Sequence, residues 1–223
     1  MLKENIDNIL KELNVGNNYN EKINLVAATK TIDYETINEA VSYGITDIGE
    51  NKVNEFKEKY DLISGANRHF IGHLQTNKVK YLIGKTFLIH SVDRLELAEE
   101  ISKRSKNADL ITDILIQINI GKEQSKGGFY IEEAENAYKK VKDLDNIKIK
   151  GLMAMLPLSQ DKQYLENLCL QMRKLYDKIK TTDKNIEYLS MGMSGDYKTA
   201  IKCGSNMVRL GSSIFGLRNY NNI

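Results

Sequence analysis

The chain has 223 residues, 28% of them charged, and its 32 basic and 30 acidic residues leave a net charge of only +2. The two signs are interspersed, without the basic patch that nucleic acid requires. No apolar run approaches the roughly 18 residues that span a bilayer, and the charged N-terminus lacks the apolar core of a secretory signal. We expect a cytoplasmic protein without nucleic acid or membrane partners, and Cys169 and Cys203 predict no disulfide framework.

Helical and strand patterns alternate along the chain. An amphipathic helix at 2–14 precedes the first apolar run, at 23–29, which predicts a strand. Asp33 is expected to cap the next helix, residues 73–78 to open another, and Asp93 with Glu96 resembles a capping box. Further strands are predicted at 45–49, 69–72, 87–90, 113–119, 147–153, 186–189 and 207–210.

Eight predicted strands separated by helical segments favour a (β/α)8 TIM barrel with an extra N-terminal helix. A doubly wound open sheet is the alternative, but the arrival of the eighth strand close to the C-terminus favours closure. No composition break, linker or low-complexity stretch interrupts the pattern. We therefore expect a single domain over residues 1–223.

Lys30 directly follows the first predicted strand, at the end of the stretch VAATK at 26–30. Ligand sites of α/β folds lie at the carboxyl ends of their strands. An amine held in a cleft there is a candidate for a Schiff base. The alternative is an ordinary surface lysine.

The segments after the seventh and eighth predicted strands have the composition of a phosphate site. Barrels commonly bind phosphate with these two loops. Gly192 allows close backbone approach, and Ser194 is expected to be both an N-cap and a hydroxyl donor. Gly211 and Ser212 offer amides and a hydroxyl, and Arg209 adds a fixed positive charge. Two ordinary turns remain the alternative.

Three other groups of residues carry weaker signals. The histidines at 69, 73 and 90 show no metal-ligand spacing, so no metal site is predicted. Asp47 and Glu50 flank a predicted strand and are interpreted as N-cap or salt-bridge residues in preference to an acid–base pair. The loop at 121–128 is interpreted either as a lid over the barrel mouth or as a solvated loop.

Eight stretches together carry a family resemblance: VAATK at 26–30, DIGEN at 47–51, HFIGHLQTNK at 69–78, HSVDR at 90–94, QINIGKEQSKGG at 117–128, GLMAM at 151–155, LSMGMSGD at 189–196 and MVRLGSSIFGLR at 207–218. In this order they resemble the pyridoxal phosphate homeostasis protein family (the YggS/PROSC group), which is similar in fold to the N-terminal barrel domain of alanine racemase. The resemblance covers nearly the whole chain. Lys52 departs from it, because many members have tyrosine there.

The resemblance implies that Lys30 forms a Schiff base with pyridoxal 5'-phosphate. Five more cofactor-binding residues follow from it: Asn51 at the ring edge, Arg209 at the pyridine nitrogen, and Ser194, Gly211 and Ser212 at the phosphate. An arginine beside the pyridine nitrogen keeps that nitrogen unprotonated, which makes the ring a weaker electron sink.

The function that the resemblance implies is a non-catalytic carrier in vitamin B6 homeostasis, with apo-enzymes that use the cofactor as expected recipients. The alternatives are an amino-acid racemase and a barrel enzyme that acts on phosphorylated sugars. A two-base racemase needs a second acid or base, which in alanine racemases comes from a separate C-terminal domain. The sequence ends at Ile223, barely past the eighth predicted strand, so we expect that domain to be absent and the protein to be a monomer.

Overall fold

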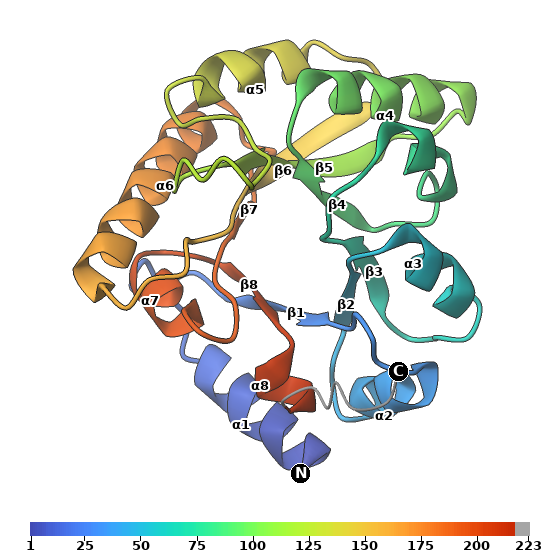
Figure 1. Ribbon diagram of the computed structural model, residues 1–223, viewed down its shortest axis with the longest axis vertical. Helices are drawn as coiled ribbons and strands as arrows, with labels where there is room; N and C mark the ends of the chain where they lie inside the picture. Colours follow the sequence, from blue (N-terminus) through green and yellow to red (C-terminus); the bar gives the residue numbers. More distant parts are fainter. Residues whose placement is uncertain (217–223) are drawn as a thin grey trace.

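Eight parallel strands pair in chain order and close into a barrel, which confirms the predicted fold (Figure 1). The computed structural model describes residues 1–216. Strand β1 pairs with both β2 and β8, so the open-sheet alternative is wrong. The strands are β1 (Asn24–Ala28), β2 (Asp47–Glu50), β3 (Asn67–Phe70), β4 (Leu88–Val92), β5 (Thr112–Ile118), β6 (Ile147–Ala154), β7 (Tyr188–Ser190) and β8 (Met207–Leu210).

Helices surround the barrel, and the predicted extra helix precedes β1 (Figure 1). The Nδ2 of Asn5 in this first helix donates to the carbonyl of Ile214 in the last one at 3.0 Å. The expected single domain over 1–223 extends past the described residues and stays a prediction. The helices are α1 (Leu2–Leu13), α2 (Tyr34–Ser42), α3 (Val53–Lys59), the 3-10 helix η1 (Thr76–Tyr81), α4 (Leu95–Asn107), α5 (Ala134–Lys142), α6 (Lys162–Thr182), α7 (Tyr197–Lys202) and α8 (Ser212–Phe215).

A layer of apolar side chains fills the middle of the barrel. It consists of Val26, Ile71, Leu88, Leu115, Met153 and Met207, all of them buried. Neighbouring positions such as Leu25 and Val208 belong to a separate cluster beneath the helices. Residues two apart in a strand share one face of the sheet. His90 and Arg209 therefore face the interior together with Leu88 and Met207.

Several local predictions are wrong. Strands β2 and β7 begin two residues later than expected, β3 begins two residues earlier, and the segment after β3 forms a 3-10 helix. Asp93 does not cap α4, whose N-cap residue is Arg94 without a side-chain cap. The carboxylate of Asp93 instead lies 3.2 Å from Nδ1 of His73 and 2.5 Å from Nη1 of Arg94. These two partners compete with the helix amides that a capping box would satisfy.

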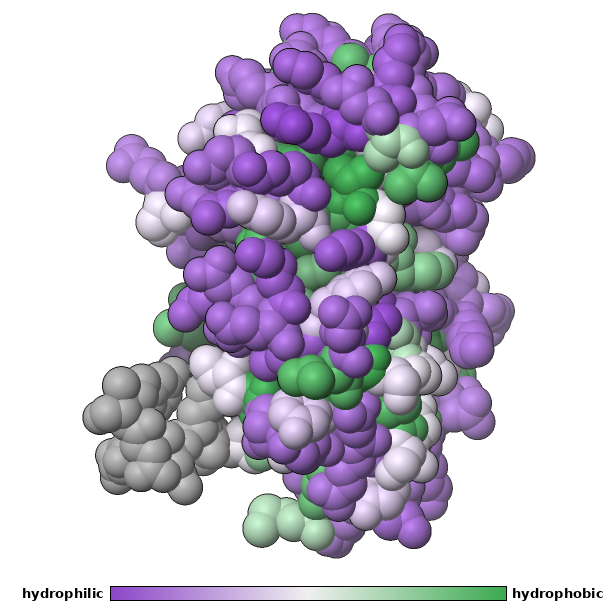
Figure 2. All heavy atoms as spheres, turned by 90° about the vertical axis from the view of Figure 1, so that its right-hand side faces the viewer, coloured by the Kyte–Doolittle hydropathy of each residue, from purple (hydrophilic) through white to green (hydrophobic). Residues whose placement is uncertain are grey.

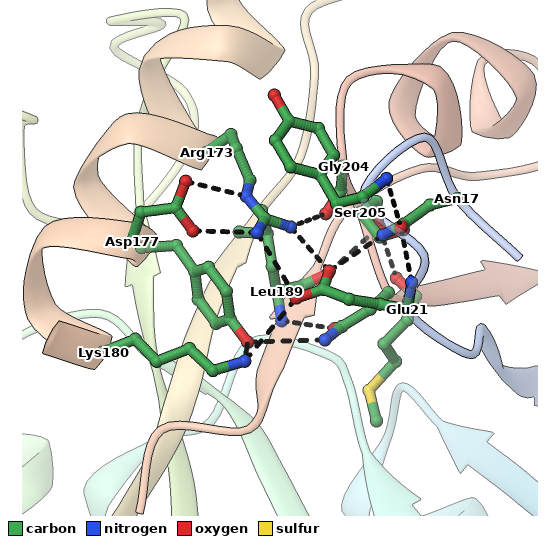
Figure 3. A network of polar contacts seen from close by, with 12 residues as sticks. Asn17, Glu21, Arg173, Asp177, Lys180, Leu189, Gly204 and Ser205 are labelled. Atoms are coloured by element: carbon green, nitrogen blue, oxygen red, sulfur yellow. Dashed lines mark hydrogen bonds and ion pairs between the residues drawn. The ribbon is translucent and has the colours of Figure 1, made fainter. Parts of the chain in front are cut away.

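A polar network around Arg173 in α6 ties the segment before β1 to the segment before β8 (Figure 3). The Nη1 of Arg173 donates to Oε2 of Glu21 at 2.6 Å and to the carbonyl of Gly204 at 3.0 Å. Its Nε donates to Asp177 at 3.0 Å, one turn further along α6. Because β1 pairs with β8, the network holds the two strands that close the barrel.

The outer surface on the α3 side of the molecule is predominantly hydrophilic, with small apolar areas between polar side chains (Figure 2). This is the pattern of amphipathic helices that turn their apolar faces toward a barrel. None of the helices in the described part of the chain is both long and apolar enough to cross a bilayer.

Candidate functional site

A cavity of about 570 Å³ opens at the carboxyl ends of the strands, the end at which barrels keep their ligand sites. Its volume lies in the usual range for small-molecule sites. All six residues that the sequence predicted for the cofactor face this one cavity. The complete lining consists of Ala28, Lys30, Asn51, Ile71, Met155, Met193, Ser194, Gly195, Arg209, Gly211 and Ser212.

The backbone on both sides of Lys30 is held by carboxylates. Before it, the buried Thr29 donates from Oγ1 to Oε1 of Glu50 at 2.8 Å. After it, Thr31 has φ +65°, which is rare for a β-branched residue, and its N–H donates to Oε2 of Glu55 at 2.8 Å. Such strained conformations persist only where the surroundings enforce them. The position of Lys30 at the rim is therefore set by its two neighbours.

Glu50 was predicted to be an N-cap or a salt-bridge residue, and it forms a salt bridge with Lys59 at 2.9 Å. Burial raises the pKa of the Glu50 carboxyl, although the hydrogen bond and positive charge of Lys59 act in the opposite direction. The Nζ of Lys59 also donates to the carbonyl of Thr29 at 3.1 Å. This buried cluster joins the ends of β1 and β2, directly beneath the Lys30 and Asn51 positions.

Arg209 reaches the cavity from inside the barrel, where only 4% of its surface is exposed. Its Nη1 donates to the carbonyl and to Oγ of Ser190, at 2.9 and 2.6 Å, and its Nη2 donates to the carbonyl of Ala154 at 2.9 Å. Burial lowers the pKa of Arg209 to about 10, which the charge of Asp196 partly offsets. The guanidinium therefore stays protonated at neutral pH while its partners in β6 and β7 are uncharged.

The two predicted phosphate loops meet at Ser194. Its Oγ accepts hydrogen bonds from the backbone amides of Gly211 and Ser213, both at 3.2 Å. The expectation that Ser194 caps the next helix is wrong, because Asp196 is the N-cap residue of α7. The hydroxyl instead joins the loop after β7 to the loop after β8. The meeting point combines backbone N–H groups with hydroxyls, the donor set that suits a phosphate.

Asn51, which lines the cavity, also carries an unsatisfied acceptor. Its Oδ1 is buried and has no hydrogen-bond partner within the described residues, although buried polar atoms are normally paired. The loop at 121–128, interpreted as a lid or a solvated loop, contributes none of the lining residues. Asn119 holds that loop closed, donating from Nδ2 to the carbonyls of Glu123 and Lys126 at 2.9 and 2.8 Å.

Replacing Gly72 by alanine is expected to disturb the site through the backbone of Asn51. A Cβ at position 72 would lie 2.0 Å from the carbonyl oxygen of Asn51 and 2.6 Å from its Cα, so this segment has to move. We expect a destabilisation of about 1–3 kcal/mol, as for other overpacked positions. Thermal unfolding checks this, and Gly195→Ala is its control, because a Cβ there meets no atom within 4 Å. Ligand binding is compared with that of the wild type, because Gly195 itself lines the cavity.

The sequence analysis assigned no role inside the barrel to Ser190 or His90. A signal was present, because each is a polar residue directly after an apolar residue of a buried strand. In the described part of the chain, no group of three His, Cys, Asp or Glu residues lies close enough to hold a metal ion.

Comparison with known proteins defines the class first. Residues 2–219 match the family model of the alanine racemase N-terminal domain. Alanine racemase of Clostridium difficile superposes with a TM-score of 0.75 at 16% identity, over 98% of this chain and 55% of that one, which is a likeness of fold. The chain is thus a barrel built like this racemase domain.

More similar relatives define the family. The pyridoxal phosphate homeostasis protein of Aquifex aeolicus is 40% identical over 199 residues, which cover 88% of this chain and 87% of that protein. The protein of the same name from Escherichia coli is 36% identical, over 90% and 88%. PipY of Synechococcus elongatus, solved with pyridoxal phosphate bound, is 26% identical with a TM-score of 0.83, over 97% of this chain and all of that one. The chain belongs to the pyridoxal phosphate homeostasis protein family.

Proposed function

We propose that this protein binds pyridoxal 5'-phosphate in the cavity through a Schiff base on Nζ of Lys30, and that it is a carrier of the cofactor. The observation that carries the proposal is the convergence of Lys30, Arg209 and the loops joined at Ser194 on one cavity. The PipY structure with the cofactor bound supports the same assignment.

Each proposed contact matches one part of the cofactor. The amine of Lys30 would hold the aldehyde carbon, and the donors at Ser194, Gly211 and Ser212 would hold the phosphate. Arg209, a fixed cation, would face the pyridine nitrogen and keep it unprotonated. Bound pyridoxal phosphate supplies an aldehyde that captures amines and a ring that withdraws electrons. The arginine weakens that withdrawal, which suits storage better than carbanion chemistry.

The acid–base groups of the cavity favour a carrier over a racemase. Two-base racemisation needs a second proton-exchanging group on the far face of the ring. Among the described lining residues, Lys30 and Arg209 are the only titratable ones, and the guanidinium holds its proton. Apo-enzymes are the proposed recipients and a monomer the proposed state. The buried free thiols of Cys169 and Cys203 fit the cytoplasmic location that we propose.

The test is uptake of the cofactor by the purified protein. Protein incubated with pyridoxal phosphate and freed of excess is expected to keep a visible absorbance band. Borohydride reduction should remove this band and convert the Schiff base to a stable amine, which is detected as a mass increase on the peptide containing Lys30. Protein that takes up no cofactor overturns the proposal. Racemisation of alanine that disappears in Lys30→Ala would overturn the carrier assignment and favour the enzyme.

Replacing Arg209 by lysine is expected to weaken cofactor retention even though the positive charge stays. A lysine has one ammonium group and cannot donate to the carbonyls of both Ser190 and Ala154 while facing the cavity. Losing one hydrogen bond to a charged group corresponds to roughly tenfold weaker binding. Equilibrium dialysis against pyridoxal phosphate measures this, with circular dichroism as the check on folding. Unchanged affinity would remove Arg209 from the site.

A further inference from the structure

Four interior side chains and one carboxylate at the foot of the barrel form an unbroken chain of hydrogen bonds. The Nη1 of Arg209 lies 2.6 Å from Oγ of Ser190, and this oxygen lies 3.2 Å from Nδ1 of His90. The Nε2 of His90 lies 2.8 Å from Nδ1 of His69. The Nε2 of His69 lies 3.0 Å from Oδ1 of Asp47. We call these five residues the interior relay.

The interior relay crosses the barrel from one end to the other. Arg209 lines the cofactor cavity, while Asp47 lines a second cavity, of about 410 Å³, beside α1 and the amino ends of β1 and β2. Between them, β7 and β8 form one wall of the barrel and β3 and β4 the opposite wall (Figure 1). His69, His90 and Ser190 are each at most 1% exposed. The interior relay thus joins the two cavities through buried side chains.

The residues at the two ends of the relay determine which atom donates in each of its hydrogen bonds. A guanidinium only donates, and an ionised carboxylate only accepts. Burial, the largest single influence, raises the pKa of Asp47, but hydrogen bonds from His69, Thr46 and Asn67 outweigh it and leave that pKa below its usual value. Asp47 is therefore ionised at neutral pH.

His90, in the middle of the relay, is neutral. Burial, followed by the charges of His69 and Arg209, holds the pKa of His90 well below its usual value. One proton on each imidazole satisfies every contact. Arg209 donates to Ser190, Ser190 donates to Nδ1 of His90, Nε2 of His90 donates to Nδ1 of His69, and Nε2 of His69 donates to Asp47. Both histidines then carry their proton on Nε2.

We propose that His69, His90 and Ser190 are positioning residues that couple the guanidinium of Arg209 to the carboxylate of Asp47 across the barrel. The relay turns the Ser190 hydroxyl hydrogen away from Arg209, so that the Ser190 oxygen accepts from Nη1 and holds the guanidinium at the cavity. Within the described residues no carboxylate lies within ion-pair distance of Arg209, and the relay supplies a remote one. The part of the proposal that concerns the cofactor rests on the proposed function.

The decisive variant is Asp47→Asn, which removes the charge and keeps the shape. An amide oxygen can still accept from His69 and Asn67, and the amide nitrogen can face Thr46, so the fold is expected to survive. The matched control is Asp113→Asn, another half-buried carboxylate at the amino end of a strand, which has no contact with the relay. Ser190→Ala, which breaks the relay at its other end, is the second variant.

The first measurement needs no cofactor. Nitrogen-15 NMR of the histidine rings at neutral pH is expected to show His69 and His90 both protonated on Nε2 in the wild type and in Asp113→Asn. Asp47→Asn is expected to mix the tautomers, because its amide can also donate. A wild-type His90 protonated on Nδ1 overturns the relay, and so does an unchanged tautomer pattern in Asp47→Asn.

The second measurement uses protein incubated with pyridoxal phosphate. We expect Asp47→Asn and Ser190→Ala each to shift the visible absorbance of the bound cofactor and to weaken its retention roughly threefold or more, with no further loss in the double variant. Retention equal to wild type in both variants overturns the coupling to the cofactor. If the wild type takes up no cofactor, the proposed function fails. The NMR result still decides whether the hydrogen bonds of the relay run in the proposed direction.

Discussion

Lys30→Ala is expected to abolish the covalent attachment of pyridoxal phosphate while the barrel stays folded. Alanine removes the only amine among the described residues that line the cavity. The phosphate loops and Arg209 remain, so weak non-covalent binding persists; a loss of about 3 kcal/mol corresponds to roughly a hundredfold higher Kd. Because the side chain of Lys30 makes no hydrogen bond or ion pair with a described residue, its removal leaves no buried partner unpaired. Thermal stability should therefore stay close to that of the wild type.

The measurement is borohydride reduction after incubation with the cofactor, followed by mass mapping. The matched control is Lys52→Ala, because Lys52 lies next to Asn51 but its side chain is 75% exposed and paired only with Glu55 at 3.8 Å. We expect the control to keep the visible band and the modified Lys30 peptide. Equal labelling of Lys30→Ala and wild type would show that the attachment lies on another lysine.

Arg173→Met is expected to cause the largest loss of stability. The change removes the hydrogen bonds of Arg173 to the partly buried carboxylate of Glu21 and to the carbonyl of Gly204, and it also removes the guanidinium 3.9 Å above the ring of Tyr19. Removing one partner of a buried ion pair costs about 3 kcal/mol. For a chain of this size that lowers Tm by roughly 6–12 °C. Calorimetry measures the change.

The control for this prediction lies on the same helix. Lys178 pairs with Glu135 at 2.6 Å, but 64% of its side chain is exposed. Lys178→Met should therefore change stability by less than about 0.5 kcal/mol. If both variants unfold at the same temperature as the wild type, the network around Arg173 does not hold the barrel closed.

The same network predicts a dependence on pH. Burial works to raise the pKa of Glu21, but hydrogen bonds from Arg173 and Asn17 and the nearby positive charges outweigh it, so the pKa lies below 4.5. A carboxyl group whose pKa is lower in the folded state than in the unfolded state stabilises the fold at pH values above its unfolded-state pKa. This stabilisation is lost as the pH falls through its folded-state pKa. We expect the wild type to lose stability below about pH 4.5 and Arg173→Met to lose less.

Five of the six predicted cavity residues could be chosen from the sequence because each lies at or just beyond the end of a strand, whereas Asn51 followed from the family resemblance. Parallel strands bring all of their carboxyl ends to one side of a barrel. Lys30 and Asn51 follow β1 and β2, and Arg209 is the last but one residue of β8. Once the strands are counted and their direction is known, these side chains have to lie near one another. Their roles toward the cofactor stay predictions.

The interactions of individual polar groups could not be predicted in this way. Asp93 has the sequence neighbours of a helix cap, yet it pairs with His73, twenty residues earlier. Ser194 has the position of a cap, yet it accepts the amides of the next loop. In both cases the competing partner comes from another strand end, and only the folded barrel brings it within hydrogen-bond distance.

By itself, then, the sequence determined the order of the elements and the end at which the cavity lies. These follow from alternating apolar patterns and turn residues, which act over short distances along the chain. Only the tertiary structure decided that His90 contacts Ser190, 100 residues away, and that Arg209 is linked to Asp47. The physical reason is that contacts across a barrel depend on the stagger and closure of its strands, because these determine which inward-facing side chains meet.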